Sequence, residues 1–599
     1  MSETLNGAEN IRWDLTELYS GIDDPAIDET LENARQHASS FVKDYKGKVA
    51  DLDPDQLAKA YDRLEELISP LYKLSQYVHL RFAIETLDDS IKALVARVEE
   101  AQSHISNQIV FFSLELGKLP PEKFELFKQT DVLSSYHYKL DKLQRNARYN
   151  LSEKEEQLIN LKDLNGINAH QKLYNELTSS FQFEFEIDGK IQTLNGDQLR
   201  ALRQHSDPDV RQRAMKLFFD RYAEHHLVFT HLYNSIVKDH GMEMSIRGYD
   251  SPISSMNSHN DLTDAAIQSL NDVTTESYSL VHRYYRLKQK LLGLDSMTLA
   301  DIYAPLPEAS RSYSFSEAQH LVLTAFGNFD KEFQDHTKRI LEKQHLDAPA
   351  EAGKRGGAFC SSSTPDLDPY VMLNFTGKIR DVATMAHELG HALHAVYSSR
   401  QPLMNYHSIL PLAETASIFS EMVLTDHFLK QESDPAVKIS LLTNKLEDIF
   451  ASSHRQNMFS RFELATHSRI AKNLQSSHDL CELYASELKL MFGDSVVITP
   501  EYHWEWSSIP HIYNVPFYVY AYNFGNLLVL GLYQKYLEDG KAFIPRYKEF
   551  LSLGSSASPA DVTATVDADI QSDDFWRKSL TYINGLIDTL EGLVENPDK

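Results

Sequence analysis

The chain has 599 residues, which is enough for several domain-sized units or for fewer units that merge into one large helical body. Hydrophobic residues make up 42% and charged residues 24%, with 29 Phe and 30 Tyr to bury, so disorder is excluded for most of the chain. The formal net charge of −27 makes nucleic acids and anionic membrane surfaces poor partners.

The cysteine content and the N-terminal sequence both favour a reducing compartment inside the cell. Cys360 and Cys481 are the only two cysteines, too few for a disulfide framework and consistent with a reducing compartment. The first residues are polar and acidic, unlike a signal peptide, and no stretch approaches 18 uninterrupted apolar residues. We therefore expect a cytoplasmic protein with no transmembrane helix.

The first 180 residues are expected to form helices. Apolar residues such as Leu57, Tyr61 and Leu64 recur at helical spacing. Asp53-Pro54 and Ser69-Pro70 are expected to break the helices and connect one to the next.

The pattern changes to period two at Phe181. Every second residue from Phe181 to Ile187 is apolar, and Asp188-Gly189 follows, which together predict a β-hairpin. We place a domain boundary after it, so that residues 1–195 form an N-terminal helical lobe ending in a hairpin and residues 196–599 form a second lobe.

A second β-like region lies near the middle of the chain. Gly356–Cys360 can run extended, and Tyr370–Phe375 is typical of a strand ended by Thr376-Gly377. Helical patterns dominate again from there to the C-terminus. The predicted fold is mostly α with a small sheet.

The most informative motif is His387-Glu388-Leu389-Gly390-His391 on a predicted helix, with Asp381 as its expected N-cap. Residues four apart share one helix face, so the imidazoles of His387 and His391 can bind one metal ion and Glu388 can reach a water on it. Zinc suits two histidines plus a carboxylate with an open fourth position. The alternative is a helix with chance surface histidines.

The third ligand distinguishes between classes of zinc site. A metzincin needs Gly at 393 and His at 397, but the chain has Leu393 and Tyr397. Glu414 lies on a following apolar helix, residues 410–422, where an unpaired carboxylate is costly unless a metal binds it. A carboxylate early in the helix could instead act as a cap.

Two further residues near the motif have open roles. Glu421 is two helical turns beyond Glu414 and could accept a ring N–H from a ligand histidine, or form an ordinary salt bridge. His394 would close the site as a fourth ligand, so we interpret it as a supporting or packing residue.

Residues 509–525 are unusually rich in tyrosine and include His511. Phenol and imidazole donors are what a zinc peptidase needs opposite the metal to bind the oxyanion of the tetrahedral intermediate. An aromatic stripe alone is more often part of a core, but buried hydroxyls need partners.

Together these residues resemble the oligoendopeptidase F group of the thimet-oligopeptidase-like (M3) metallopeptidases. The resemblance covers essentially the whole chain. The segments that carry it, besides the motif itself, are Ile11–Tyr19, Lys354–Cys360, Tyr370–Gly377, Glu414–Glu421, Pro510–Tyr513 and Pro516–Tyr520.

The resemblance implies a two-lobed helical zincin that encloses a deep substrate channel and has a small β-sheet next to the active-site helix. It implies one Zn²⁺ per chain and hydrolysis of internal bonds in short unstructured peptides. The zinc ligands would be His387, His391 and Glu414, with Glu388 as general base and with His511, Tyr513 and Tyr520 contacting substrate and oxyanion. Tyr518 and Tyr522 remain alternates, because the tyrosine-rich run allows more than one register.

The resemblance also implies how a peptide would be held. The strand around Met372–Phe375 and the segment Gly356–Phe359 would bind the peptide backbone as an added strand.

Two rival functions remain open at this point. A helical zinc carboxypeptidase would use the same motif and would need a cation such as Arg355 or Lys354 for the substrate carboxylate. A peptide-binding protein that has lost catalysis is the other rival, which the intact Glu388 argues against. Cleavage preference and oligomeric state cannot be read from the sequence.

Overall fold

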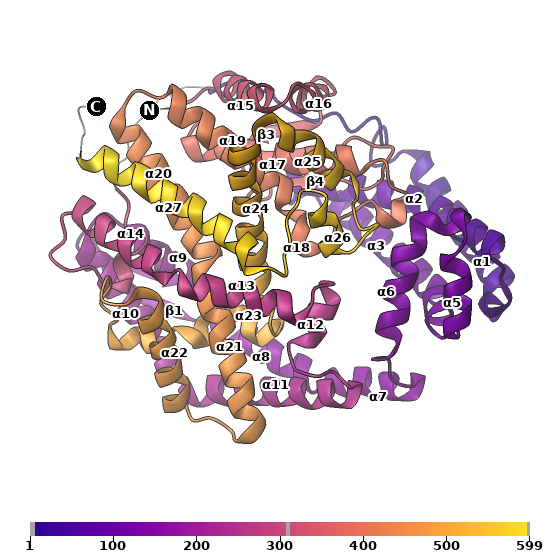
Figure 1. The fold of residues 1–599 in the computed structure, drawn as a ribbon, viewed down its shortest axis with the longest axis horizontal. Helices are drawn as coiled ribbons and strands as arrows, with labels where there is room; N and C mark the ends of the chain where they lie inside the picture. Colours follow the sequence, from indigo (N-terminus) through magenta and orange to yellow (C-terminus); the bar gives the residue numbers. More distant parts are fainter. Residues whose placement is uncertain (1–5, 307–311, 596–599) are drawn as a thin grey trace. The chain divides into compact units, whose positions relative to one another are not determined.

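The computed structural model describes residues 6–306 and 312–595 and is mostly helical, with two small β-sheets (Figure 1). The expected fold class, mostly α with a small sheet near the middle of the chain, is confirmed. Tertiary contacts divide the chain into two compact units of three segments each. Unit 1 comprises Met1–Arg148, Ser310–Gln431 and Tyr536–Ala568, and unit 2 comprises Tyr149–Ala309, Glu432–Lys535 and Asp569–Lys599.

The predicted hairpin is present as strands β1 (Gln182–Ile187) and β2 (Lys190–Asn195). Asp188 and Gly189 form its turn with φ of 51° and 73°, the positive values that a two-residue type I′ turn requires. The hairpin lies inside unit 2. The predicted lobe boundary at 195/196 rests on the sequence pattern, whereas the two units are defined by tertiary contacts between residues. The predicted boundary therefore stays a prediction.

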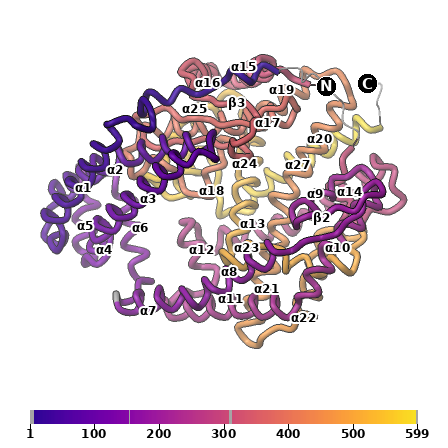
Figure 2. Tube along the Cα trace, turned by 180° about the vertical axis from the view of Figure 1, so that it is seen from behind, coloured from indigo at the N-terminus to yellow at the C-terminus, as the bar shows by residue number. Residues whose placement is uncertain are grey.

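Unit 1 begins with a helical region in which α1, α2 and α3 pack against one another (Figure 2). Its helices are α1 Pro25–Tyr45, α2 Pro54–Ile84, α3 Asp89–Ile109, α4 Phe111–Gly117, α5 Pro121–Lys128, α6 His137–Ala147, α15 Phe315–Phe329, α16 Lys331–Glu342, α17 Ile379–Ser398, α18 Leu410–Ala413, α19 Thr415–Gln431, α25 Phe543–Ser552 and α26 Pro559–Ala564.

Helix α2 continues through Ser69-Pro70, so the helix break predicted there is wrong. A proline inside a helix removes one backbone hydrogen bond and costs about 3 kcal/mol. Leu67, Leu71 and Leu74 are buried on both sides of Pro70, and this packing offsets the cost.

A three-stranded sheet in unit 1 supports the helix that carries the motif His387–His391. Its strands are β3 Leu346–Pro349, β4 Phe359–Ser361 and β5 Tyr370–Phe375, in the order β3-β5-β4. Strand β5 is parallel to β3 and antiparallel to β4, and α17 follows it directly and packs on β4 and β5. The predicted sheet next to this helix is therefore confirmed.

Unit 2 is built around α21, which packs against α11, α13, α20 and α22. Helix α24 crosses the boundary between the two units. The helices of this part of the chain are α7 Glu153–Asp163, α8 Ile167–Ser179, α9 Gly196–Ala201, α10 Pro208–Glu224, α11 His226–Arg247, α12 Ser254–His259, α13 Asp264–Glu276, α14 Tyr278–Leu291, α20 Pro435–Ser452, α21 His454–Lys472, α22 Ser477–Phe492, α23 Pro510–Asn514, α24 Tyr520–Asp539 and α27 Asp573–Glu595.

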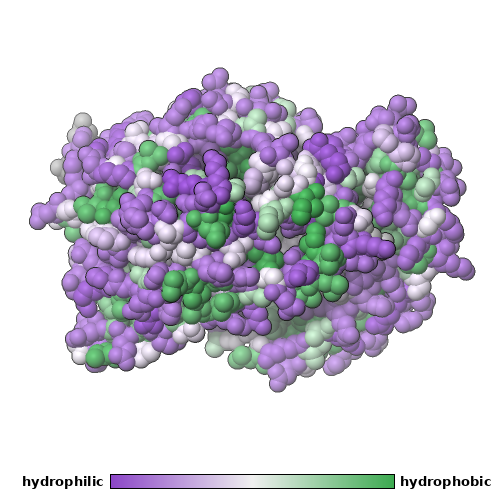
Figure 3. All heavy atoms as spheres, turned by 90° about the horizontal axis from the view of Figure 1, so that it is seen from below, coloured by the Kyte–Doolittle hydropathy of each residue, from purple (hydrophilic) through white to green (hydrophobic). Residues whose placement is uncertain are grey.

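The surface is polar on the face drawn in Figure 3. Hydrophobic residues form small patches there that are separated by hydrophilic side chains. Across residues 6–306 and 312–595, every helix is either too short or too polar to span a membrane.

Candidate metal centre

Helix α17 presents His387 and His391 one turn apart, with ring centroids 4.9 Å from each other. The helix begins at Ile379, so Asp381 is not the N-cap that we predicted but the third helical residue. Its Oδ2 caps the helix from inside by accepting hydrogen bonds from the backbone N–H groups of Thr376 at 2.7 Å and Lys378 at 3.1 Å.

Gly390 allows the backbone of a second helix to approach this one. A Cβ atom at this position would lie 2.6 Å from the carbonyl oxygen of Ala416 and 2.7 Å from Cα of Ser417. Helix α19 can therefore cross α17 at a distance that no other residue at position 390 would permit. This close crossing brings the residues at the start of α19 to the two histidines.

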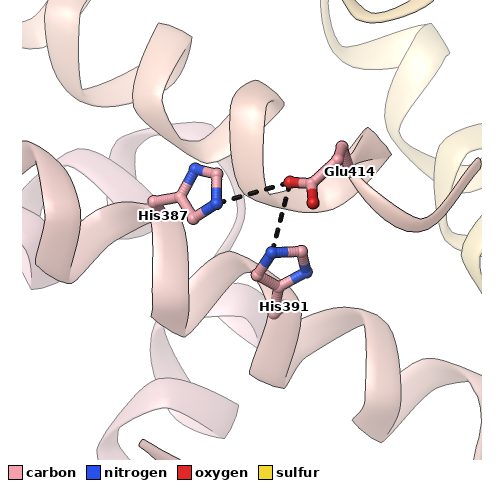
Figure 4. Close-up of side chains that lie close together, drawn as sticks. All are labelled: His387, His391 and Glu414. Carbon is pink, nitrogen blue, oxygen red and sulfur yellow. Dashed lines mark ion pairs between the residues drawn. The ribbon is translucent and has the colours of Figure 1, made fainter. Parts of the chain in front are cut away.

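Glu414 lies at the break between α18 and α19, with φ of −82° and ψ of 2°, and not inside one continuous helix as predicted. Its Oε2 is 3.4 Å from Nε2 of His387 and 3.3 Å from Nε2 of His391 (Figure 4). The hydroxyl of Ser417 donates to the same oxygen at 2.8 Å and so helps to orient the carboxylate.

These three donors fit a zinc ion. Ligand atoms of His387, His391 and Glu414 all lie within 4.8 Å of one another. Zinc binds imidazole nitrogen and carboxylate oxygen at about 2.0–2.1 Å, so two corners of its tetrahedron lie about 3.3 Å apart. The two nitrogen–oxygen distances match such edges, and three protein ligands leave a fourth position for water.

Glu421 orients His387 from the other side of the ring. Its Oε1 lies 2.6 Å from Nδ1 of His387, the contact expected for a carboxylate behind a ligand histidine. Burial alone would lower the pKa of His387, but hydrogen bonds to Glu414 and Glu421 raise this pKa to about 10. A bound metal ion would displace the proton from Nε2, and the proton left on Nδ1 would be donated to Glu421.

Glu388 lies in the wall of a cavity of about 380 Å³ in unit 1, together with both histidines and Glu414. The residue is 7% exposed, and burial raises the pKa of its carboxyl group. The other residues that line this cavity are Ala358, Phe359, Cys360, Ser362, His394, Ala395, Ser398, Tyr406, His407, Ser408 and Ala413.

His394 has a supporting position and is not part of the three-donor group. Its ring is hydrogen-bonded to the backbone of Ala413, and burial lowers its pKa to about 4, so it is neutral near pH 7. It therefore stabilises the segment that ends in Glu414, in agreement with its interpretation as a packing residue.

The sheet next to the candidate metal centre has β5 as its central strand. Strand β3 runs along one side of β5, whereas β4 on the other side pairs only with Tyr370–Met372. The predicted binding of a peptide backbone along Met372–Phe375 stays a prediction. Strand β4 (Phe359–Ser361) is the edge strand, and Ala358, Phe359, Cys360 and Ser362 line the cavity. A bound peptide could pair with the free edge of β4.

Tyr406 and His407 line the same cavity and were missed in the sequence. They follow the short helical turn Leu403–Asn405, where no periodic pattern indicates which way a side chain points. Only their residue types, a phenol and an imidazole, could have drawn attention to them.

The tyrosine-rich segment lies in unit 2 and separates its side chains into two groups. His511, Tyr518 and Tyr522 form one cluster at its surface, and Tyr522 is 40% exposed. The rings of His511 and Tyr518 stack at 5.8 Å, and the hydroxyl of Tyr522 lies 3.3 Å from Nε2 of His511. Burial lowers the pKa of His511.

Tyr513 and Tyr520 are fully buried, at 0% exposure. Tyr513 stacks on Tyr174 at 4.0 Å, and the hydroxyl of Tyr520 accepts a hydrogen bond from the side-chain amide of Asn260 at 2.9 Å. Burial therefore favours the alternates Tyr518 and Tyr522 as groups that can meet a substrate. The predicted roles of Tyr513 and Tyr520 remain untested.

The helical fold and the His-His-Glu group occur together in a known class of enzymes. Residues 201–582 match the family model described as peptidase family M3, and residues 115–183 match the model described as oligopeptidase F. The first match covers more than half of the chain, so the chain belongs to peptidase family M3 and is a peptidase.

Individual relatives match over nearly the full length. An oligoendopeptidase F homolog from Lactococcus lactis is 25% identical over 98% of both chains, and oligopeptidase PepF from Bacillus subtilis is 26% identical over 97% of this chain and 87% of its own. A crystal structure of a candidate peptidase from Chlamydophila abortus superposes with a TM-score of 0.88 at 25% identity, covering 97% of this chain and 98% of its own. Oligoendopeptidase F from Enterococcus faecium shares the fold, with a TM-score of 0.68 at 23% identity, covering 95% of this chain and 98% of its own.

Proposed function

We propose that the chain is a zinc-dependent endopeptidase that hydrolyses internal bonds of short, unstructured peptides. One Zn²⁺ per chain would bind to His387, His391 and Glu414, with Glu388 as general base. The observation that carries the proposal is that three donor atoms at the spacing of a zinc tetrahedron share one cavity with a buried carboxylate.

Each residue of the proposed site would have its own role in hydrolysis. Zinc, when bound, supplies a Lewis acid that makes water a nucleophile near neutral pH. Glu388 takes the proton of the attacking water and passes it to the leaving amine, since it is the unligated carboxylate of the motif. Glu421 holds the proton on Nδ1 of His387 and keeps that ring in its binding orientation.

Oxyanion donors would come from the segment 511–522. A phenol or imidazole N–H at the developing oxyanion stabilises the transition state by about 2.7–4 kcal/mol. We assign this role to His511 with Tyr518 and Tyr522, because their polar atoms are grouped and partly exposed. Tyr513 and Tyr520, predicted from the sequence as substrate contacts, are fully buried and are therefore the less favoured pair, and mutagenesis tests this choice.

The substrate would lie extended along strand β4. An edge strand offers unpaired backbone groups to a peptide, and this requires a segment with no structure of its own. Relatives named oligoendopeptidase support a preference for short chains and internal bonds. A cytoplasmic location stays a prediction.

The test is turnover of an internally quenched peptide of about eight residues with both ends blocked. We expect internal cleavage, identified by mass spectrometry, that stops with a chelator and returns with zinc. Glu388→Gln should retain zinc and lose about 10²–10⁴-fold in kcat. Glu342→Gln, a change at an exposed residue of α16, serves as the control. Substantial activity of pure Glu388→Gln protein would contradict the mechanism.

Of the two cations considered for the rival carboxypeptidase, Lys354 is taken up by an ion pair, whereas Arg355 is exposed and stays open as a test of that rival. The Lys354 side chain is fully buried and paired with Asp347 at 2.6 Å, and Arg355 lies over the ring of Phe359. Neither residue lines the cavity. Cleavage only of peptides with a free carboxyl terminus would restore that rival, and zinc binding without turnover of any peptide would favour a silent binding protein.

A further inference from the structure

Phe517 has an unusual backbone conformation between His511 and Tyr518. Its φ is +62°, in the left-handed region that a residue with a large side chain rarely adopts. Such a conformation persists only where the surrounding structure imposes it, and such positions often occur at functional sites. The direction of the chain at Tyr518, and hence of its side chain, depends on this angle.

Glu463 on α21 holds Phe517 in this conformation. The backbone N–H of Phe517 donates to Oε1 of Glu463 at 2.6 Å, and Glu463 is 0% exposed. The Phe517 ring, 1% exposed, packs on the ring of His467 with centroids 4.3 Å apart. Backbone and side chain of Phe517 are thus both anchored to the same helix.

A buried carboxylate is a costly way to bind one backbone N–H. Among the described residues the second oxygen of Glu463, Oε2, has no hydrogen-bond partner. Burial raises the pKa of Glu463 to about 8, which reflects this cost. An apolar residue at position 463 would avoid the buried carboxyl group but would leave the backbone N–H of Phe517 without its acceptor, so the glutamate serves the conformation of Phe517.

We propose that Glu463 is a positioning residue that holds the segment 514–519 so that Tyr518 stacks on His511 beside Tyr522. The proposal rests on the proposed function, in which this cluster supplies the oxyanion donors. Glu463 itself would touch neither substrate nor metal. Its contribution would appear in kcat because it fixes the direction of a donor, and misplacement by about 1 Å can cost on the order of 100-fold in rate.

Two conservative variants separate hydrogen-bond reach from charge. Glu463→Gln keeps the length and an acceptor oxygen but removes the ionisable group, whereas Glu463→Asp keeps the ionisable carboxyl group but withdraws the acceptor by one methylene. We expect Glu463→Asp to lose about 10–100-fold in kcat with little change in KM, and Glu463→Gln to stay within about threefold of wild type. Glu482→Asp, at an exposed residue of α22, is the matched control.

A merely structural role would lower the melting temperature and leave kcat per folded molecule unchanged. Folded Glu463→Asp protein with wild-type kcat would therefore overturn the proposal. Zinc content should equal that of wild type in both variants, since the ligands lie on other elements.

The coupling to Tyr518 supplies a second readout. In a Tyr518→Phe background, Glu463→Asp should cost less than about threefold, because the donor that it positions is already gone. Fully additive losses would overturn the proposal. If neither Tyr518→Phe nor Tyr522→Phe changes kcat, the donor assignment of the proposed function fails, and this result is independent of the behaviour of Glu463 in the wild-type background.

Discussion

The metal centre and the segment 511–522 hold their polar groups in different ways. At the metal centre, two helices cross closely at Gly390, and the donors follow from helical spacing plus one break at Glu414. In the segment 511–522, the direction of Tyr518 depends on one left-handed residue and on a carboxylate from another helix. The donors of the first site can be predicted from the sequence because they follow helical spacing. The direction of Tyr518 cannot, because it depends on a contact with a residue far away in the sequence.

The largest expected effect is loss of the metal itself. Glu414→Ala removes one of three protein ligands, so we expect loss of zinc on dialysis and a fall in kcat/KM of at least about 10³-fold. Elemental analysis and peptide turnover measure both quantities. Glu342→Ala on the exposed face of α16 should change neither. Zinc retained at one per chain in Glu414→Ala would show that another residue is the third ligand.

The tyrosines of the segment 511–522 should divide into two pairs. Tyr518→Phe or Tyr522→Phe should each lower kcat by up to about 10²–10³-fold if the residue is an oxyanion donor. Tyr520→Phe should leave kcat nearly unchanged and lower the free energy of unfolding by about 1–3 kcal/mol, because the buried amide of Asn260 loses its partner.

Tyr513→Phe should be close to neutral, because its hydroxyl has no hydrogen-bond partner among the described residues. Steady-state kinetics and urea unfolding of the four variants test this division. A large loss of kcat in folded Tyr520→Phe or Tyr513→Phe protein would restore the original register of the donors.

A smaller effect is expected from the carboxylate behind His387. Glu421→Ala removes the acceptor at Nδ1 and should weaken zinc binding by about 10–100-fold while the three ligands remain. Competition with a metal-binding dye measures the affinity. An unchanged dissociation constant would mean that the 2.6 Å contact does not orient the ring.

The smallest effect concerns the helix crossing. Gly390→Ala places a methyl group against Ala416 and Ser417 and should destabilise the fold by about 1–3 kcal/mol. Gly585→Ala, in open space on α27, is the matched control and should be neutral or slightly stabilising. Thermal unfolding with equal loss in both variants would argue against a tight crossing.

Sequence patterns predicted the fold class, the hairpin and the helix that carries His387 and His391, because these depend on local periodicity. The sequence left Glu421 open between a ring N–H acceptor and an ordinary salt bridge, and the structure places its Oε1 at Nδ1 of His387. The break at Glu414, the helix through Pro70 and the central position of β5 were not predicted. Each of these depends on what packs against the segment from elsewhere in the chain.

The tyrosines of the segment 511–522 also show what the sequence could not predict, here for individual side chains. Tyr518 and Tyr520 are two residues apart and equally attractive as donors, yet one is partly exposed and the other is fully buried. Tyr520 begins α24 and accepts a hydrogen bond from Asn260, whereas Tyr518 follows the left-handed residue Phe517, whose N–H is bound by Glu463. No pattern in the sequence predicts a positive φ angle at a phenylalanine.

The division of each compact unit into three chain segments affects how the protein can be made. Unit 1 is complete only when Tyr536–Ala568 has joined it, although its last metal-site residue, Glu421, is synthesised more than a hundred residues earlier. At about 5–20 residues per second, a ribosome needs on the order of ten seconds to cover that interval. During this time α17 and α19 exist without α25, which packs on α17. The nascent chain therefore has the side chains of the candidate metal centre long before unit 1 is complete, and we expect proteolytic activity to begin only when synthesis is nearly finished.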